Sequence, residues 1–257
     1  MKQRIITGLK LALVCGVPLY FGGIYLYVLL ALTTIVGLYE FIKMRSQGFN
    51  AILYFVMLAY VMAILFLDIK YLLVSNILLL IILFCLAIAS EDFTTDDVGM
   101  NFAFSFLFAN ALNAIIMIYS YGWKLMIYLI IAALLCDAGA YFVGYLFGKH
   151  KLNKRISPKK TIEGAIGGVL VGFILSIVYA YYILLPLNYF TFNFYLLCSF
   201  VLPIISEFGD LAFSLIKRHY AIKDFGNIFP GHGGVLDRID SLIFALVIFE
   251  AFVVVVL

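Results

Sequence analysis

Residues 71–89, YLLVSNILLLIILFCLAIA, form a run without a single charged side chain. About 20 apolar residues are enough to cross the hydrocarbon core of a bilayer as a helix, so this run predicts a membrane-spanning segment. Similar runs recur along the whole chain, which has 257 residues, 66% of them hydrophobic and 12% charged. A soluble domain is only about half apolar. The sequence therefore predicts an all-α polytopic membrane protein.

The apolar runs predict nine transmembrane helices in one membrane-embedded domain over residues 1–257. Pro18 and Gly22–Gly23 predict a break between the first two helices, although one long kinked helix is the alternative. The first run is expected to stay uncleaved, because no small-residue cleavage site leads into a soluble mature chain. The predicted helices are 5–21, 23–42, 50–67, 71–89, 100–119, 124–147, 164–185, 193–216 and 239–257.

The basic residues predict the orientation of the chain. With a cytoplasmic N-terminus and nine spans, all of the 17 lysines and arginines except Lys70 and Lys124 fall on the cytoplasmic side. The positive-inside rule favours this arrangement. It also places both conspicuous polar loops, 148–163 and 217–238, on that same side.

Asp137 lies inside a predicted span, where a charge is costly and usually functional. It is either a structural acid near a helix end or a polar group that faces a cytoplasmic cavity. Ala140, Gly144 and Gly148 follow it at intervals of four, a spacing that lets a second helix approach closely.

The next segment, 148–164, combines six lysines and arginines with a histidine. The charge alone is typical of a topology signal lying on anionic lipid headgroups. The stretch SPKKT, 157–161, further predicts a turn that delivers Lys159 and Lys160 to the start of a helix, where phosphate binds well. The glycines at intervals of four in 164–172 are interpreted as helix packing.

The stretch 207–217 places two acids inside a predicted helix. The spacing of its polar residues predicts one polar stripe on that helix, formed by Glu207, Asp210, Ser214 and Lys217. A carboxylate inside a span stays ionised only beside a metal ion or in a water-filled cavity.

The stretch GHGGVLDRID, 231–240, combines glycines that permit close backbone approach to a ligand with Asp237 and Asp240. Asp237 is expected to meet Asp210 at the cytoplasmic ends of their helices. A few hard oxygen ligands favour magnesium over zinc, and the four scattered cysteines form no CxxC pair. His232 is interpreted as a structural or substrate hydrogen-bond partner, with a role as ligand or base as the alternative.

These residues together resemble the signature of the phosphatidate cytidylyltransferases, also called CDP-diacylglycerol synthases. The resemblance is specific over 137–241 and includes DAGAYFVGYLFGKH, SPKKTIEG and FGDL; Ile162 and Phe213 depart from the family's usual residues. The residues of the terminal signature are Ser214, Lys217, Arg218, Lys223, Asp224, Gly226, Pro230, His232, Gly233, Gly234, Asp237, Arg238 and Asp240.

The resemblance implies a metal-dependent integral membrane enzyme that converts CTP and phosphatidate into CDP-diacylglycerol and diphosphate. Asp210 and Asp237 would hold Mg²⁺, with Asp137, Glu207 and Asp240 as second candidates. The predicted catalytic residues are Asp210, Asp237, Lys223, Asp224, His232 and Arg238. The predicted phosphate-binding residues are Lys159, Lys160, Lys217, Arg218, Gly231, Gly233 and Gly234, with Lys223 and Arg238 as further cations.

The resemblance also implies the partners and the location. The bilayer and the two substrates are the expected partners, nucleic acid is not, and the protein is placed in a bacterial cell membrane with its active site facing the cytoplasm. Residues 1–119 would pack the bundle or form a homodimer interface, and 120–257 would carry the chemistry.

Two other functions compete with this interpretation. A CTP-dependent lipid kinase would use similar metal and lysine chemistry, but its hydroxyl nucleophile would benefit from a base. A transporter would show inverted repeats with broken helices in both halves, whereas the polar motifs here crowd into the second half.

Overall fold

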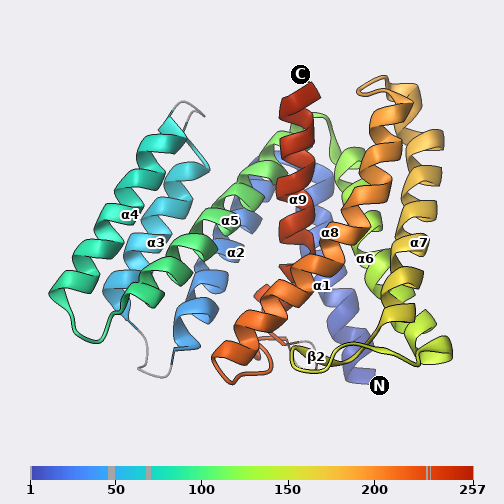
Figure 1. Ribbon diagram of the computed structural model, residues 1–257. Coiled ribbons are helices and arrows are strands. Elements are labelled where there is room, and N and C mark those ends of the chain that lie inside the picture. The colour runs from blue at the N-terminus through green and yellow to red at the C-terminus, as the bar shows by residue number, and fades with distance from the viewer. Residues whose placement is uncertain (1, 46–49, 68–70, 230, 232, 257) are drawn as a thin grey trace. The chain divides into compact units, whose positions relative to one another are not determined.

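The computed structural model describes residues 2–45, 50–67, 71–229, 231 and 233–256. Over these residues it contains nine α-helices and one short two-stranded sheet, which confirms the predicted all-α architecture (Figure 1). The chain divides into two compact units, 1–116 with 224–238 and 117–223 with 239–257. The expectation of one membrane-embedded domain, split near residue 119, stays a prediction.

The first unit is built from the N-terminal helices. They are α1 (Lys2–Phe21), α2 (Gly23–Lys43), α3 (Ala51–Ile64), α4 (Leu72–Ala89) and most of α5 (Thr95–Ser120). The predicted break between the first two helices is confirmed, because Gly22 leaves the helical region with φ 64° and ψ −149°. The aromatic rings of Phe41 and Phe104 stack between α2 and α5, with centroids 3.6 Å apart.

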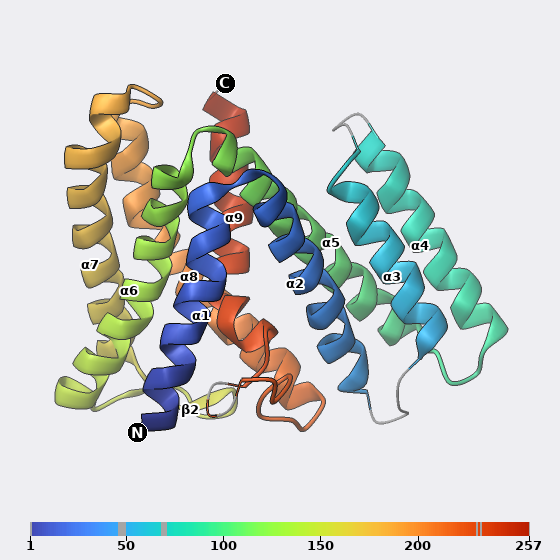
Figure 2. The same cartoon turned by 180° about the vertical axis from the view of Figure 1, so that it is seen from behind.

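The second unit contains the remaining helices and the sheet. They are α6 (Trp123–Phe147), β1 (Lys151–Asn153), β2 (Ser157–Thr161), α7 (Ile162–Tyr179), α8 (Phe192–His219) and most of α9 (Leu236–Val256). A π turn (Ala180–Leu184) and a 3₁₀ turn (Leu185–Leu187) extend α7. The α6 and α7 helices lie side by side in both views (Figures 1 and 2).

Small residues set the contact of α6 with α7, as their spacing predicted. A Cβ atom added at Gly168 would lie 2.6 Å from the Cys136 carbonyl oxygen, and one at Gly167 would lie 2.5 Å from a Val143 methyl carbon. Gly164 is likewise buried against Ala140. Because the two backbones meet this closely, a side chain larger than hydrogen does not fit at these positions of α7.

Several helix boundaries differ from the prediction for local reasons. The α5 helix begins at Thr95 instead of 100, because Thr94 and Asp97 form a capping box in which each side chain accepts the other's backbone N–H. The acidic stretch that precedes residue 100 therefore starts a helix. The α3 helix ends at Ile64 instead of 67, where Phe66 and Leu67 donate their N–H groups to the Ala63 carbonyl in a tightened turn.

The predicted turn over 157–161 is wrong, because these residues form strand β2. The chain reverses just before β2, after Asn153, whose side-chain oxygen accepts the N–H groups of Arg155 and Ile156. Strand β2 then pairs antiparallel with β1. Its last residue, Thr161, caps α7 by accepting the Gly164 N–H, so the predicted delivery of Lys160 to a helix start is confirmed.

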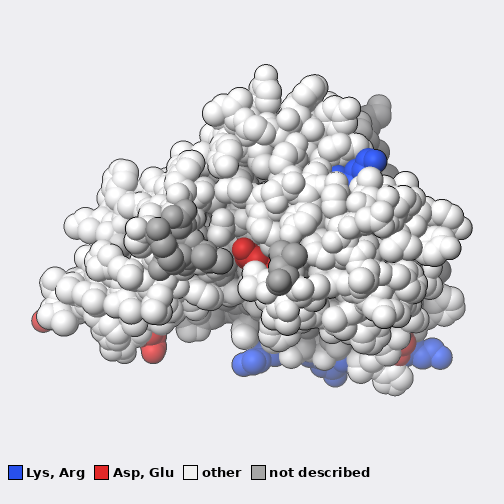
Figure 3. Space-filling model, turned by 90° about the horizontal axis from the view of Figure 1, so that it is seen from above, with Lys and Arg blue, Asp and Glu red and all other residues white. Residues whose placement is uncertain are grey.

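Seven of the helices in the described chain are long and apolar enough to cross a membrane: α2, α4, α5, α6, α7 with its extension, α8 and α9. Seen from above, most of the visible surface is uncharged, and the charged groups lie mainly at its edges (Figure 3). The α3 helix has 14 residues, about 21 Å, which is short of a hydrocarbon core of about 30 Å. The predicted cytoplasmic N-terminus stays a prediction.

Candidate active site

The second unit holds a partly buried cation between two carboxylates, and we call Lys160, Glu207 and Asp210 the lysine–carboxylate cluster. The Lys160 Nζ atom lies 2.6 Å from Glu207 Oε2 and 2.6 Å from Asp210 Oδ2. Lys160 comes from the end of β2, and both acids come from α8, one helical turn apart. The sequence predicted a metal or water as the reason that two acids tolerate this span, whereas here a lysine supplies the opposite charge.

The charge state of Lys160 follows from its surroundings. Burial alone lowers the pKa of this ammonium group, but the charges of Asp210 and Glu207 outweigh burial and hold its pKa above the ordinary value. Lys160 therefore carries its proton at neutral pH. The cluster has two negative charges against one positive charge, which leaves it able to attract a second cation.

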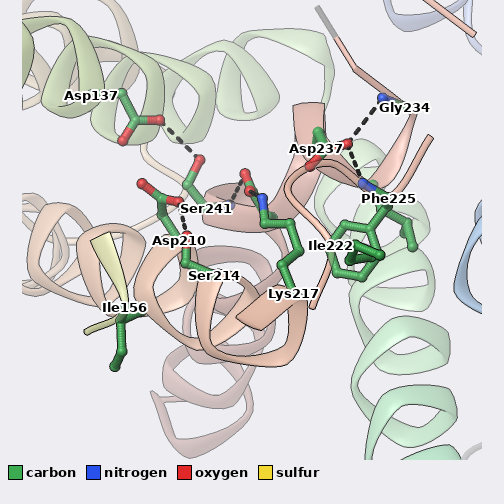
Figure 4. Close-up of polar contacts among 12 residues, drawn as sticks. Asp137, Ile156, Asp210, Ser214, Lys217, Ile222, Phe225, Gly234, Asp237 and Ser241 are labelled. Atoms are coloured by element: carbon green, nitrogen blue, oxygen red, sulfur yellow. Dashed lines mark hydrogen bonds and ion pairs between the residues drawn. The ribbon is translucent and has the colours of Figure 1, made fainter. Parts of the chain in front are cut away.

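The predicted polar stripe on α8 is confirmed. Below the cluster, Ser214 Oγ donates to Asp210 Oδ1 at 3.4 Å, and Lys217 Nζ lies 3.5 Å from Asp240 Oδ2 of α9 (Figure 4). Lys217 and Asp240 are both buried. Side chains of alternating charge therefore run from Lys160, in the hairpin formed by β1 and β2, along α8 to Lys217.

Asp137 of α6 joins the same region from the other side. Its Oδ2 atom accepts a hydrogen bond from Ser241 Oγ of α9 at 3.0 Å (Figure 4). The carboxylate is close enough to Asp210 for the two charges to repel. Asp137 therefore makes a structural hydrogen bond and also lines a cavity, whereas the cytoplasmic side of that cavity stays a prediction.

This cavity has a volume of about 480 Å³ within the second unit. One part of its wall is acidic and includes Asp137, Glu207 and Asp210. Glu207 Oε1 is buried there and has no hydrogen-bond partner among the described residues. A buried carboxylate oxygen without a donor is costly, so this atom is suited to a cation or donor brought in by a ligand.

In the first unit, a buried glutamate that the sequence analysis missed holds the glycine-rich loop. Glu40 of α2 accepts the Val235 N–H at Oε1 and the Leu236 N–H at Oε2, each at 3.0 Å. A Cβ atom at Gly226 or Gly234 would collide with this carboxylate. A single acid in an otherwise apolar run was the available signal, because such acids usually have a function.

Asp237 organises the same loop from within. Its Oδ2 atom accepts the N–H groups of Phe225 at 2.8 Å and Gly234 at 3.0 Å (Figure 4). Gly231 and Gly233 both have positive φ values, 78° and 79°, which L side chains rarely adopt. The glycines therefore serve the loop's own geometry, and their predicted contact with phosphate stays a prediction.

The other predicted site residues lie at the surface. Arg218 donates to the backbone carbonyls of Ile156 at 3.2 Å and Ile222 at 2.8 Å, so it ties the hairpin to the end of α8. Lys159, Lys223, Asp224 and Arg238 are exposed. His232 and Pro230 lie outside the described residues. Asp210 and Asp237 belong to different units, so their expected meeting stays a prediction.

The fold and the site define a polytopic membrane protein with a cavity whose walls carry both carboxylates and lysines. The sequence profile of the cytidylyltransferase family matches residues 2–256, and the chain belongs to this family. A phosphatidate cytidylyltransferase of Bacillus subtilis (strain 168) is 32% identical over 258 residues, which cover 96% of this chain and 95% of the relative.

Two staphylococcal proteins match about half of the chain more closely. A phosphatidate cytidylyltransferase of Staphylococcus haemolyticus is 46% identical over 125 residues, 49% of this chain and 47% of its own length. One from Staphylococcus epidermidis is 43% identical over 127 residues, 49% of this chain and 48% of its own length.

Proposed function

We propose that this protein is a phosphatidate cytidylyltransferase, which makes CDP-diacylglycerol and diphosphate from CTP and phosphatidate in phospholipid biosynthesis. The main support is the near full-length similarity to a relative of that name. The family profile and the membrane-spanning helices agree with it.

The chemistry asks for charge neutralisation more than for a base. An oxygen of the phosphatidate phosphate attacks the α-phosphorus of CTP, and the bond between that phosphorus and the bridging oxygen breaks to release diphosphate. A phosphate monoester is largely dianionic at neutral pH, since its second pKa is about 6, so the attacking oxygen needs no deprotonation. The difficulty is to hold two anions in contact, which requires positioned cations. Lys160 is such a cation, already held in place by Glu207 and Asp210.

The reaction is proposed to need Mg²⁺, and the donors of the second unit fit this ion. All the acidic ligands there are hard oxygens, and Glu207 Oε1 is a buried acceptor without a partner in the described chain. Among the described residues no group of three or more His, Cys, Asp or Glu side chains could hold a metal alone. Mg²⁺ is commonly held by one or two carboxylates together with substrate phosphates, so a complete protein cage is not required.

Asp210 is the proposed metal ligand in the second unit, with Asp137 and Glu207 beside it, and Asp237 stays a predicted ligand. When bound, the ion would supply positive charge that stabilises the leaving diphosphate. The protein's own lysines would neutralise the remaining phosphate charge. The site is proposed to face the cytoplasm of a bacterial cell, where CTP is dissolved, and a homodimer is a further proposal.

The test is transfer of radiolabel by the purified protein in mixed micelles of detergent and phosphatidate. Label from the α-phosphate of CTP should enter the lipid only when Mg²⁺ is present, and EDTA should stop the transfer. Label that enters from the γ-phosphate instead would identify a lipid kinase and refute the proposal. Transfer that survives thorough chelation would refute the metal alone.

A further inference from the structure

The wall of the cavity in the second unit carries acids and lysines that come from different elements. Its acidic part contains Asp137, Glu207 and Asp210, whereas strands β1 and β2 contribute Lys151 and Lys159. Lys160 is already paired with two carboxylates. Lys151 and Lys159 form no ion pair with any other residue that the structure describes. These two exposed lysines are therefore ready to accept an anion.

The same cavity borders a surface suited to lipid. Tyr141 and Tyr145 of α6 line it, one helical turn apart, and their side chains are 68% and 78% exposed. Their rings stack nearly parallel, with centroids 6.5 Å apart. Phe142 and Leu146, their neighbours on this membrane-spanning helix, are also largely exposed. Exposed tyrosines at the end of a span are typical of the membrane interface, so acyl chains can lie against this part of α6.

We propose that Lys151 and Lys159 hold the phosphate of the lipid substrate, with Tyr141 and Tyr145 beside its glycerol backbone. This inference rests on the proposed function. Phosphate can come from the lipid headgroup or from CTP, and the position favours the lipid. The headgroup of phosphatidate must stay near its acyl chains, and Lys151 and Lys159 line the same cavity as the exposed Tyr141 and Tyr145.

The charges agree with this division of the cavity. A phosphate monoester carries a charge of about −1.5 to −2 at pH 7, which two lysines match. The acidic wall would repel a bare phosphate, and it suits a metal-bound triphosphate instead. The lipid phosphate would then bind beside Lys151 and Lys159, and the metal-bound triphosphate would bind beside the acidic residues.

The hairpin offers a matched control. Lys154 lies in the turn between the strands, is also exposed, and does not line the cavity. General attraction of the basic hairpin to anionic lipid would involve all three lysines alike. A specific phosphate-binding site would involve only Lys151 and Lys159 of these three lysines.

The experiment measures KM for each substrate in mixed micelles. For phosphatidate, its surface fraction is varied at saturating CTP; for CTP, its concentration is varied at a saturating surface fraction of phosphatidate. Lys151→Ala and Lys159→Ala should each raise KM for phosphatidate about tenfold, the expected loss for one charge-assisted hydrogen bond, and leave KM for CTP unchanged. Lys151→Arg and Lys159→Arg should restore most of the affinity. Lys154→Ala should change neither constant.

Two outcomes would overturn the proposal. If KM for CTP rises instead, the lysines hold the triphosphate; if Lys154→Ala behaves like Lys151→Ala, only surface attraction exists. Calorimetric titration with dihexanoyl phosphatidate, without CTP, adds a readout that is independent of turnover. If the wild-type protein binds this lipid through Lys151 and Lys159 but transfers no label, the proposed function is refuted. The proposed lipid-phosphate site would still hold in that case.

Discussion

The two units both bury carboxylates, but they satisfy them in opposite ways. In the first unit, Glu40 and Asp237 each accept two backbone N–H groups from the loop that precedes α9 and from the first residue of that helix. In the second unit, Glu207 and Asp210 share the ammonium group of Lys160. Backbone donors are fixed by the fold, whereas a lysine side chain can move to another anion. The first arrangement fixes the conformation of a loop. The second holds a lysine charge that can pair instead with an anionic group of a bound substrate.

This difference predicts that stability and activity respond to different carboxylates. Removing an acceptor from a buried backbone N–H leaves that group unsatisfied and costs about 1–3 kcal/mol. Removing one acid from the lysine–carboxylate cluster still leaves Lys160 with the other. The loop acids should therefore dominate the thermal stability, and the cluster acids should dominate turnover.

The largest effect is expected for Asp210→Asn. Loss of a charged group that faces the reacting phosphates should lower kcat about 10²- to 10³-fold. The apparent melting temperature should change little, because Glu207 still pairs with Lys160. Both are measured on the same detergent-purified sample, by α-label transfer and by thermal unfolding.

The matched control for this variant is Ser214→Ala. It removes only the hydrogen bond from Ser214 Oγ to Asp210 Oδ1, so activity should fall only a few-fold. An Asp210→Asn protein that keeps near wild-type activity, while it remains folded, would remove Asp210 from the chemistry.

A smaller loss of activity, but the largest loss of stability, is expected for Glu40→Gln. Each Glu40 oxygen accepts a different N–H, so the amide nitrogen of glutamine would face a donor. The first unit should lose about 1–3 kcal/mol, and proteolysis within 224–235 should quicken. Unchanged proteolysis of this loop would show that Glu40 does not hold it.

Asp237→Asn is the comparison for Glu40→Gln. A single oxygen of Asp237 accepts both backbone hydrogen bonds, and the asparagine carbonyl can replace it. The loop should therefore resist proteolysis better in Asp237→Asn than in Glu40→Gln. If Asp237 also holds the metal, as predicted, turnover should nevertheless be lost.

The helices could be predicted because apolar runs and glycine breaks are local signals. The failures came from polar groups whose partners decide their structure. Asp97 lies before the start of the predicted helix 100–119, and only its exchange of hydrogen bonds with Thr94 shows that the helix begins there. The hairpin was missed because only the Asn153 turn reveals where the chain reverses.

The site was predictable as a set of residues but not as a set of contacts. Glu207 and Asp210 were identified by their spacing on one helix. The partner of these acids, Lys160, lies about 50 residues earlier in the chain, and spacing gives no information across such a distance. Glu40 shows the same limit, since a lone acid in an apolar helix does not reveal that backbone N–H groups are its partners.

A smaller effect than that of Asp210→Asn is expected for Glu207→Gln, and it separates a role in positioning Lys160 from a role as metal ligand. If Glu207 positions Lys160, the variant should lower kcat about tenfold, because Lys160 keeps Asp210 but loses its second anchor. The Mg²⁺ concentration for half-maximal activity should then stay at the wild-type value. If Glu207 is instead a metal ligand through its unpartnered Oε1 atom, that concentration should rise tenfold or more. A Mg²⁺ titration of Glu207→Gln beside wild type therefore decides whether the cluster holds its lysine or its metal through this residue.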